Sequence, residues 1–306
     1  MKLHGTSYID SNGHLYIGDV NTVQLAKQFS TPLYVYDVAL IRQKAKELKQ
    51  AFEAHHVNYQ VAYASKAFSC KAIVQVMKED VVSGGELYTA LSAGFPAEKI
   101  HFNGNNKSYA EIEMAVKAGI GCFIVDNFYE LQLLERAARA HQTVISVLIR
   151  LTPGVEAETH DYILTGQEDS KFGFDIKSGQ ATRAIQQILG NPHFQLLGIH
   201  SHIGSQIFET TGFVLTIEKL YNEIENWQKQ FNFIPKVLNV GGGFGIRYTK
   251  DDQPIPLKNY VNDIVQTVKK ESTRLQIEVP EIWIEPGRSL VGDAGTTLYT
   301  IGSEKE

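Results

Sequence analysis

A lysine at the end of a short apolar segment is the first feature of this sequence with chemical potential. The segment from Tyr59 to Ala64 is apolar and bounded by polar residues, which predicts a strand buried on both faces. Lys66 follows it, so we expect a poorly solvated ammonium group. Desolvation lowers the pKa of an amine and makes it a nucleophile that can hold an aldehyde as a Schiff base. On this segment alone, a lysine that merely reaches the surface is the more ordinary interpretation.

The apolar segments along the chain predict the elements that position this lysine. Short apolar segments alternate with helix-like segments over about 225 residues, the size and period of a (β/α)8 TIM barrel. A doubly wound open sheet is the alternative. The expected strands are 59–64, 80–82, 100–102, 122–125, 144–149, 196–199, 237–240 and 282–284.

The two ends of the chain fall outside this repeat. Residues 3–17 predict two short strands joined by a turn, and residues 33–36 predict another strand. We therefore expect an α/β protein with a second, incomplete β domain formed by the chain ends. The expected parts are residues 1–35 as N-terminal strands of the β domain, 36–288 as the barrel, and 289–306 as the truncated start of the C-terminal β domain.

Composition excludes several classes of function. The formal net charge of -5 and the pI of about 6.1 argue against a nucleic-acid-binding protein. We find no apolar run long enough to span a membrane and no signal-peptide core, so we expect a cytoplasmic protein without membrane partners. The two cysteines, Cys70 and Cys122, have neither the number nor the spacing of a metal site, and no metal is expected.

Polar residues and glycines gather where the expected strands end. In a barrel the active site lies at the carboxyl ends of the strands, so these residues should converge on one face. They are Lys66 after the first strand, Ser83, Gly84 and Gly85 after the second, Arg150 after the fifth, His200, His202, Gly204 and Ser205 after the sixth, the Gly241–Gly245 segment after the seventh, and Glu285, Gly287 and Arg288 after the eighth.

The glycine run predicts an anion site. Gly241, Gly242 and Gly243 would let backbone N–H groups approach a phosphate, and barrels often bind phosphate after strands seven and eight. Gly287 beside Arg288 adds a second close approach and a permanent cation. A flexible turn is the alternative for the run taken alone.

One cofactor needs this whole set of groups. Pyridoxal 5'-phosphate requires a lysine for its aldehyde, donors for its phosphate and a partner for its pyridine nitrogen. Glu285 can be that partner, since a carboxylate keeps the nitrogen protonated, and His202 can stack on the ring. Each residue taken alone would instead be read as a helix-capping glutamate or a core histidine.

At this point the sequence resembles the diaminopimelate decarboxylase family, within the fold-type III, alanine-racemase-like pyridoxal phosphate enzymes. The resemblance covers nearly the whole chain. The Gly-Asn-Asn-Lys and Gly-Gln-Glu-Asp-Ser-Lys-Phe-Gly segments point to the diaminopimelate branch in particular. The motifs are Tyr63–Lys66, Asp80–Glu86, His101–Lys107, Gly166–Gly173, His200–Gln206, Gly241–Gly245 and Glu285–Arg288.

The resemblance implies a role for each site residue. It makes Lys66 the catalytic Schiff-base lysine, with His202 stacked on the ring and Glu285 paired with the pyridine nitrogen. It places Arg288 near the cofactor and a substrate carboxylate. The residues it assigns to the phosphate are Ser205, Gly241, Gly242, Gly243 and Gly287, and those it assigns to supporting the ring are Asp80 and Arg150.

The activity implied by the resemblance is decarboxylation of meso-2,6-diaminopimelate to L-lysine and CO2, the last step of lysine biosynthesis, by a homodimer. A related decarboxylase or racemase acting on ornithine, arginine or alanine is one alternative, and a cofactor binder without turnover is another. Two departures stand out. The family usually has valine where Ser65 stands and asparagine where Phe68 stands. It also continues beyond the end of this sequence, in a region that carries a cysteine followed by an acidic residue and that is expected to complete the proton donor from the partner subunit. We therefore expect this chain to be a truncated enzyme with little activity.

Overall fold

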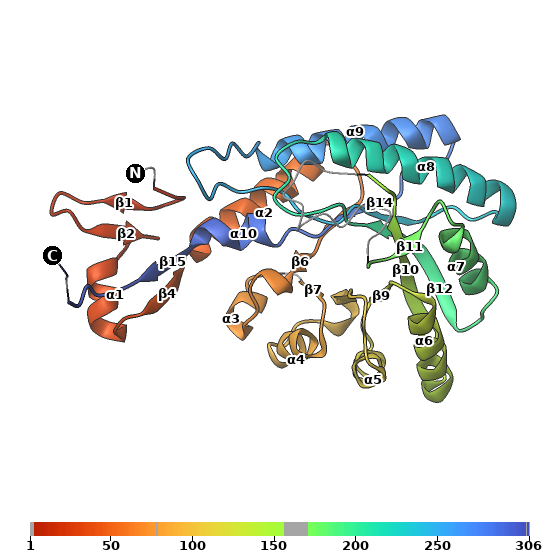
Figure 1. Ribbon diagram of the computed structural model, residues 1–306, viewed down its shortest axis with the longest axis horizontal. Coiled ribbons are helices and arrows are strands. Elements are labelled where there is room, and N and C mark those ends of the chain that lie inside the picture. Colours follow the sequence, from red (N-terminus) through yellow and green to blue (C-terminus); the bar gives the residue numbers. More distant parts are fainter. Residues whose placement is uncertain (1–2, 78, 156–170, 304, 306) are drawn as a thin grey trace.

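The structure is a computed structural model that describes residues 3–77, 79–155, 171–303 and 305, with only the backbone of residues 79–81. Parallel strands and surrounding helices make up most of the molecule, and a smaller layer at one side contains both ends of the chain (Figure 1).

The parallel sheet closes on itself. β5 (Tyr59–Val61) and β6 (Tyr63–Ala64) are separated by one residue, yet they lie at opposite ends of the strand order β5-β14-β13-β12-β10-β9-β8-β7-β6. One interrupted strand thus pairs with β14 on one side and β7 on the other, which makes a barrel and excludes the open sheet. The other strands are β7 (Glu79–Val81), β8 (His101–Phe102), β9 (Cys122–Val125), β10 (Ile145–Thr152), β12 (Phe194–Ser201), β13 (Val237–Asn239) and β14 (Glu281–Ile284), and β11 (Phe174–Asp175) pairs with β10 alone.

The barrel prediction is confirmed, with two strands longer than expected. β10 and β12 continue past the predicted ends, so Arg150 and His200 lie within strands and not in the loops after them. Both side chains are buried, because the last residues of these strands contribute to a polar barrel interior. A polar residue was therefore a poor marker of where these strands end.

Helices surround the barrel and are capped by local sequence signals. Ser108 and Glu111 form a complete capping box at the start of α5, as their spacing predicts. Ser83 caps α4, but the carboxylate of Glu86 binds elsewhere. The helices are α2 (Val38–Glu53), α3 (Lys71–Val74), α4 (Gly84–Ser92), α5 (Tyr109–Ala118), α6 (Phe128–His141), α7 (Gln180–Leu189), α8 (Thr211–Phe231), α9 (Leu257–Leu275) and α10 (Arg288–Val291), with 3-10 turns η1 (Ser65–Ala67), η2 (Ala97–Lys99) and η4 (Gly292–Ala294).

Two apolar clusters stabilise the barrel. The larger lies between the strands and the helices, and includes the fully buried Trp227, Tyr221 and Tyr260. The smaller lies inside the barrel and consists of Cys122, Ile124, Leu148, Val237 and Trp283. The interior is therefore a packed core, as expected for a barrel of this size, and it supports the polar residues at the strand ends.

The chain ends pair with each other beside the barrel (Figure 1). β4 (Leu33–Tyr36) is antiparallel to β15 (Gly295–Leu298), while β1 (Tyr8–Ile9), β2 (Leu15–Ile17) and β3 (Val20–Asn21) form a separate antiparallel sheet. α1 (Thr22–Phe29) was not predicted; the Asn21 side chain starts it by accepting the N–H groups of Val23 and Gln24. The domain boundaries stay a prediction.

The described residues contain no helix long and apolar enough to cross a membrane. Within the same part of the chain no group of three or more His, Cys, Asp or Glu residues is arranged to hold a metal ion. Cys70 is half-buried and Cys122 is buried, and no disulfide joins them in the part of the chain that the structure describes.

Candidate active site

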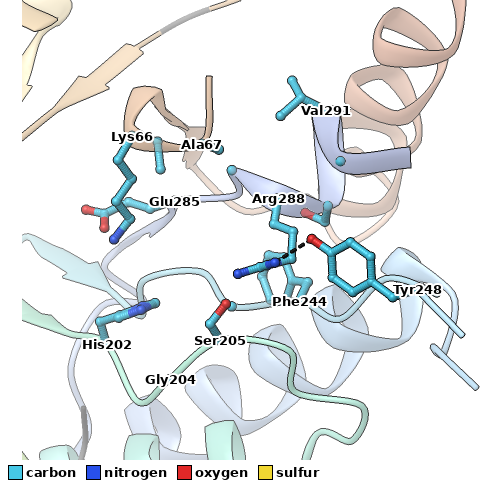
Figure 2. Close-up of a pocket in the computed structure, with 15 residues that line it drawn as sticks. Lys66, Ala67, His202, Gly204, Ser205, Phe244, Tyr248, Glu285, Arg288 and Val291 are labelled. Carbon is cyan, nitrogen blue, oxygen red and sulfur yellow. Dashed lines mark hydrogen bonds between the residues drawn. The ribbon is translucent and has the colours of Figure 1, made fainter. Parts of the chain in front are cut away.

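A cavity of about 500 Å³ opens at the carboxyl ends of the barrel strands (Figure 2). It brings together most of the residues expected from the sequence, with Gly204 and Phe244 of the recognised motifs among them, and adds Tyr248, which the sequence analysis did not select. Gly241 and Gly242 adjoin it in the loop after β13. The predicted residues that line it are Lys66, His202, Ser205, Gly243, Glu285, Gly287 and Arg288.

The turn that carries Lys66 is fixed on both sides. Its first residue, Ser65, donates a hydrogen bond of 2.5 Å to the Glu86 carboxylate, which also accepts the Val82 N–H at 3.0 Å. Gly287 packs on the other side, where a Cβ atom would lie 3.1 Å from the Ala64 carbonyl oxygen. Lys66 therefore projects into the cavity from a rigid turn (Figure 2).

The expected poor solvation of Lys66 is wrong for the chain alone. Its side chain is exposed, since the strand ends at Ala64 and Lys66 lies two residues later at the open mouth of the cavity. Protein side chains thus do not enclose this amine. Its access to a small-molecule aldehyde is correspondingly unobstructed.

Glu285 is a buried carboxylate at the floor of the cavity, 7% exposed. Its Oε1 accepts a hydrogen bond of 2.7 Å from the Asn239 amide, and its Oε2 lies 3.2 Å from Nε2 of His200 and 3.5 Å from the Asn103 amide. Burial alone would raise the pKa of Glu285, but His200 and Asn239 favour the anion and hold the pKa below its ordinary value. Glu285 is therefore ionised at neutral pH.

The histidines around Glu285 are neutral. Burial lowers the pKa of His200, although Glu285 opposes the shift, and burial lowers the pKa of His202 well below its ordinary value. A neutral His200 can donate its Nε2–H to Glu285. The Nδ1 atom of His202 accepts the Gly242 N–H at 3.2 Å, which fixes the orientation of the ring at the cavity wall.

Close approach of neighbouring backbones requires the glycine run. A Cβ atom at Gly242 would lie 2.0 Å from the Glu285 carbonyl oxygen, and one at Gly243 would lie 2.2 Å from the Gly204 carbonyl oxygen. The N–H of Gly241 donates to Asn239 and that of Gly242 to His202. Of the three glycine N–H groups, only that of Gly243 has no hydrogen-bond partner among the described residues, so it can bind an anion.

Arg288 supplies positive charge at the other side of the cavity from Glu285 (Figure 2). Its Nη1 donates to the Tyr248 hydroxyl, and its buried Nε has no partner among the described residues. No carboxylate lies within 4 Å of its guanidinium in that part of the chain. The cavity therefore has a negative floor at Glu285 and an unmatched cation at Arg288.

One segment of the recognised motifs, His101–Lys107, serves the framework. Lys107 is buried, forms a 2.7 Å ion pair with Glu130 and donates to the carbonyl oxygens of Gly104 and Ile124. It thereby fixes the loop that follows β8. Residues 166–170 of the Gly166–Gly173 motif lie outside the described residues, as does the Asp80 side chain.

Arg150 lies beneath the site and does not line the cavity. Its Nη1 lies 3.4 Å from the side-chain amide oxygen Oδ1 of Asn103 and 3.9 Å from the Asp126 carboxylate, and its guanidinium covers the ring of Phe172. Through Asn103 it is linked to Glu285. Its expected place behind the cofactor ring stays a prediction.

Sequence reasoning missed Asn103, Asn239 and Tyr248. Asn103 and Asn239 each stand two residues from a polar or glycine position already chosen, so strand alternation could have placed them in the barrel interior. Tyr248 lies in the loop after β13, where neither periodicity nor a motif marks it.

The cavity fits pyridoxal phosphate. An ionised, buried carboxylate with neutral partners suits a protonated pyridine nitrogen, and the Arg288 cation together with the free Gly243 N–H suits a phosphate. Lys66 is accessible for the aldehyde, and the His202 ring forms part of the cavity wall. The residues that would hold the cofactor are thus all in the same cavity.

Comparison with known proteins agrees with this chemistry. Residues 38–292 match the family described as pyridoxal-dependent decarboxylase, pyridoxal binding domain. The diaminopimelate decarboxylase of Bacillus subtilis (strain 168) is 60% identical over 311 residues, covering 100% of this chain and 71% of that protein. That of Staphylococcus aureus (strain COL) is 43% identical, covering 97% of this chain and 70% of that protein.

Solved structures give the same result. A crystal structure of diaminopimelate decarboxylase from M. jannaschii has a TM-score of 0.91 at 35% identity, covering 98% of this chain and 70% of that chain. A second, in complex with L-lysine, has a TM-score of 0.88 at 35% identity, covering 95% of this chain and 68% of that chain. The chain therefore belongs to the pyridoxal-dependent decarboxylases and, among them, to the diaminopimelate decarboxylase family.

Proposed function

We propose that this chain binds pyridoxal 5'-phosphate in the cavity and decarboxylates meso-2,6-diaminopimelate to L-lysine and CO2, the last step of lysine biosynthesis. One observation carries the proposal: an accessible lysine, a buried ionised glutamate and an arginine that has no acidic partner among the described residues line one cavity at the strand ends. The relatives at 60% and 43% identity carry the name of this activity.

When bound, pyridoxal phosphate supplies a ring that accepts the electron pair left as the substrate loses its carboxylate. Lys66 would hold the cofactor by its amine, and the amino group of the substrate would take its place there. The turn between Glu86 and Gly287 keeps Lys66 at the cavity, so the amine stays within reach during this exchange.

Glu285 would hold the proton on the ring nitrogen of the cofactor. Its carboxylate is ionised. His200 and Asn239 donate hydrogen bonds to it but carry no charge, so they do not neutralise it and its negative charge is available to the ligand. Because the group is buried, this interaction is stronger than it would be in water. Removing the charge should therefore affect turnover more than binding.

Arg288, Ser205 and the Gly243 N–H form the anion-binding side. The guanidinium is permanently charged and rigidly planar, which suits phosphate and carboxylate oxygens alike. The glycine and Gly204 approach so closely that a side chain at position 243 would displace the loop.

Two further statements rest on the family resemblance alone. We infer that the enzyme is cytoplasmic and that it acts as a homodimer when its full length is present. Sedimentation of the full-length protein measures the second statement directly.

The test is CO2 release from meso-diaminopimelate by the cofactor-loaded protein, beside ornithine, arginine and alanine at equal concentration. Release from diaminopimelate alone supports the proposal. Release from ornithine or arginine, or racemisation of alanine, would assign a related activity to the same cavity. Cofactor binding without turnover by the full-length protein would contradict the decarboxylase assignment.

A further inference from the structure

The side chain of Tyr248 contacts the guanidinium of Arg288 at the cavity. Arg288 has no carboxylate within 4 Å among the described residues, so its charge is not used by the fold in that part of the chain. The Tyr248 hydroxyl accepts a hydrogen bond from Nη1, and the Cζ atom of Arg288 lies 5.5 Å from the centre of the tyrosine ring. Tyr248 therefore contacts the guanidinium through both its hydroxyl and its ring.

The ring is not placed there by burial. Tyr248 is 57% exposed, and a tyrosine with so much free surface gains little from apolar packing. Its main chain is nevertheless fixed, since Asp252 accepts the N–H groups of Tyr248 and Thr249 at 2.8 and 2.7 Å. The loop thus presents the side chain to Arg288 although the core does not require it.

A second anchor lies two residues earlier. The Gln206 amide donates to the Ile246 carbonyl oxygen and accepts the Ile246 N–H, each at 3.0 Å. Gly292 lies against this anchor, because a Cβ atom there would lie 2.5 Å from Ile246 and 3.4 Å from the Arg288 stem. The loop and the arginine are therefore positioned against each other.

We propose that Tyr248 is a positioning residue that holds the Arg288 guanidinium toward an oxyanion in the cavity, either the cofactor phosphate or the substrate carboxylate. This inference rests on the proposed function. The bond to Tyr248 occupies one of the five N–H donors of the guanidinium and leaves others for the oxyanion.

The experiment compares Tyr248→Phe with wild type and with Tyr88→Phe, a control on α4 whose ring is also exposed and does not line the cavity. The dissociation constants of pyridoxal phosphate and of pyridoxal, which lacks the phosphate, are measured by absorbance. The dissociation constant of L-lysine is measured on cofactor-loaded protein. Thermal unfolding of the unloaded chains reports on the fold.

Tyr248→Phe should raise the dissociation constant of one ligand roughly tenfold, which is the effect of losing one hydrogen bond to a charged group. A loss for pyridoxal phosphate but not pyridoxal identifies the phosphate, and a loss for L-lysine alone identifies the carboxylate. In an Arg288→Met background the same change should have no further effect. An independent, additive loss there would overturn the inference.

The remaining outcomes separate the two proposals. If wild type binds pyridoxal phosphate and Tyr248→Phe binds all three ligands equally well, Tyr248 has no positioning role, whatever the enzyme does. If wild type takes up no pyridoxal phosphate, the proposed function fails and this inference fails with it. A Tyr248→Phe chain that unfolds at a lower temperature than Tyr88→Phe would assign the tyrosine to the fold.

Discussion

The Ser65 hydroxyl donates a hydrogen bond of 2.5 Å to the Glu86 carboxylate and so ties the turn that carries Lys66 to the first turn of α4. Serine stands here where the family usually has valine. Ser65 as a whole is 1% exposed, so its hydroxyl is buried. A buried hydroxyl needs a partner, and Glu86 supplies it. The departure from the family pattern is thus accommodated by a carboxylate that also holds the Val82 N–H.

Ser65→Ala should lower the free energy of unfolding by about 1–3 kcal/mol, because it removes a hydrogen bond to a charged acceptor from a buried position. Ser65→Thr keeps the hydroxyl and should lose less. Urea unfolding of the unloaded chain measures both. Equal stability of Ser65→Ala and wild type would show that the bond contributes nothing to the turn.

Lys66→Ala should abolish covalent attachment of pyridoxal phosphate. Lys66 is the lysine that lines the cavity, whereas Lys107 is buried in its ion pair with Glu130. The measurement is borohydride reduction followed by peptide mapping, with Lys71→Ala as the control because Lys71 is exposed on the neighbouring helix α3. A reduced adduct on Lys71 or Lys107 in the wild-type chain would reassign the attachment site.

Glu285→Gln should leave pyridoxal phosphate bound and remove most turnover. The amide keeps the size of the side chain and its contacts with Asn239, but it cannot hold a proton on the ring nitrogen. The cofactor dissociation constant and the kcat for diaminopimelate, measured on the full-length protein, separate these effects. Wild-type kcat in the variant would give Glu285 another role.

The barrel could be predicted because its signal is repeated along the chain. Each buried parallel strand is a short apolar run, and the closing pair between β14 and β5 follows from strand number alone. The ends of β10 and β12 could not be predicted, since Arg150 and His200 are polar yet buried inside the barrel. Apolar patterning does not identify such positions.

The site was predictable where chemistry limits the residue type. A lysine, a glutamate and a glycine run at strand ends suggest one cofactor, and the cavity contains them. Tyr248 was not predictable, because it acts through the Arg288 guanidinium across a loop contact that sequence spacing does not encode. The prediction that the Lys66 amine is poorly solvated was wrong because the sequence did not indicate the turn after β6.

Stability should fall as the pH drops below about 6.5, the ordinary pKa of histidine. Burial lowers the pKa of His101 to about 4, opposed by Glu285, and His200 and His202 shift in the same direction. Between the two values the unfolded chain binds protons that the folded chain does not, so each such histidine costs up to about 1.4 kcal/mol per pH unit.

Urea unfolding of the unloaded chain at several pH values between 7.5 and 4.5 measures this slope. His101→Gln should reduce it, because glutamine does not titrate. His4→Gln, at an exposed position, is the control and should leave the slope unchanged. An unchanged slope in His101→Gln would mean that His101 does not contribute to the pH dependence.

The last prediction concerns the sheet of β4 and β15, which should make the 306-residue chain self-associate. Tyr34 lies in β4, and Tyr299 and Ile301 follow the end of β15; their side chains are 74%, 73% and 81% exposed. Within the described residues this sheet has two strands, and unpaired edges beside apolar side chains favour association.

Light scattering of the 306-residue chain at increasing concentration should show species larger than a monomer. Replacing Tyr34, Tyr299 and Ile301 together by threonine keeps the preference for strand structure and should reduce the scattering. The control is Tyr88→Thr, which removes an exposed ring from the barrel surface. A chain that remains monomeric at every concentration, with or without these substitutions, would show that these three exposed side chains do not drive association.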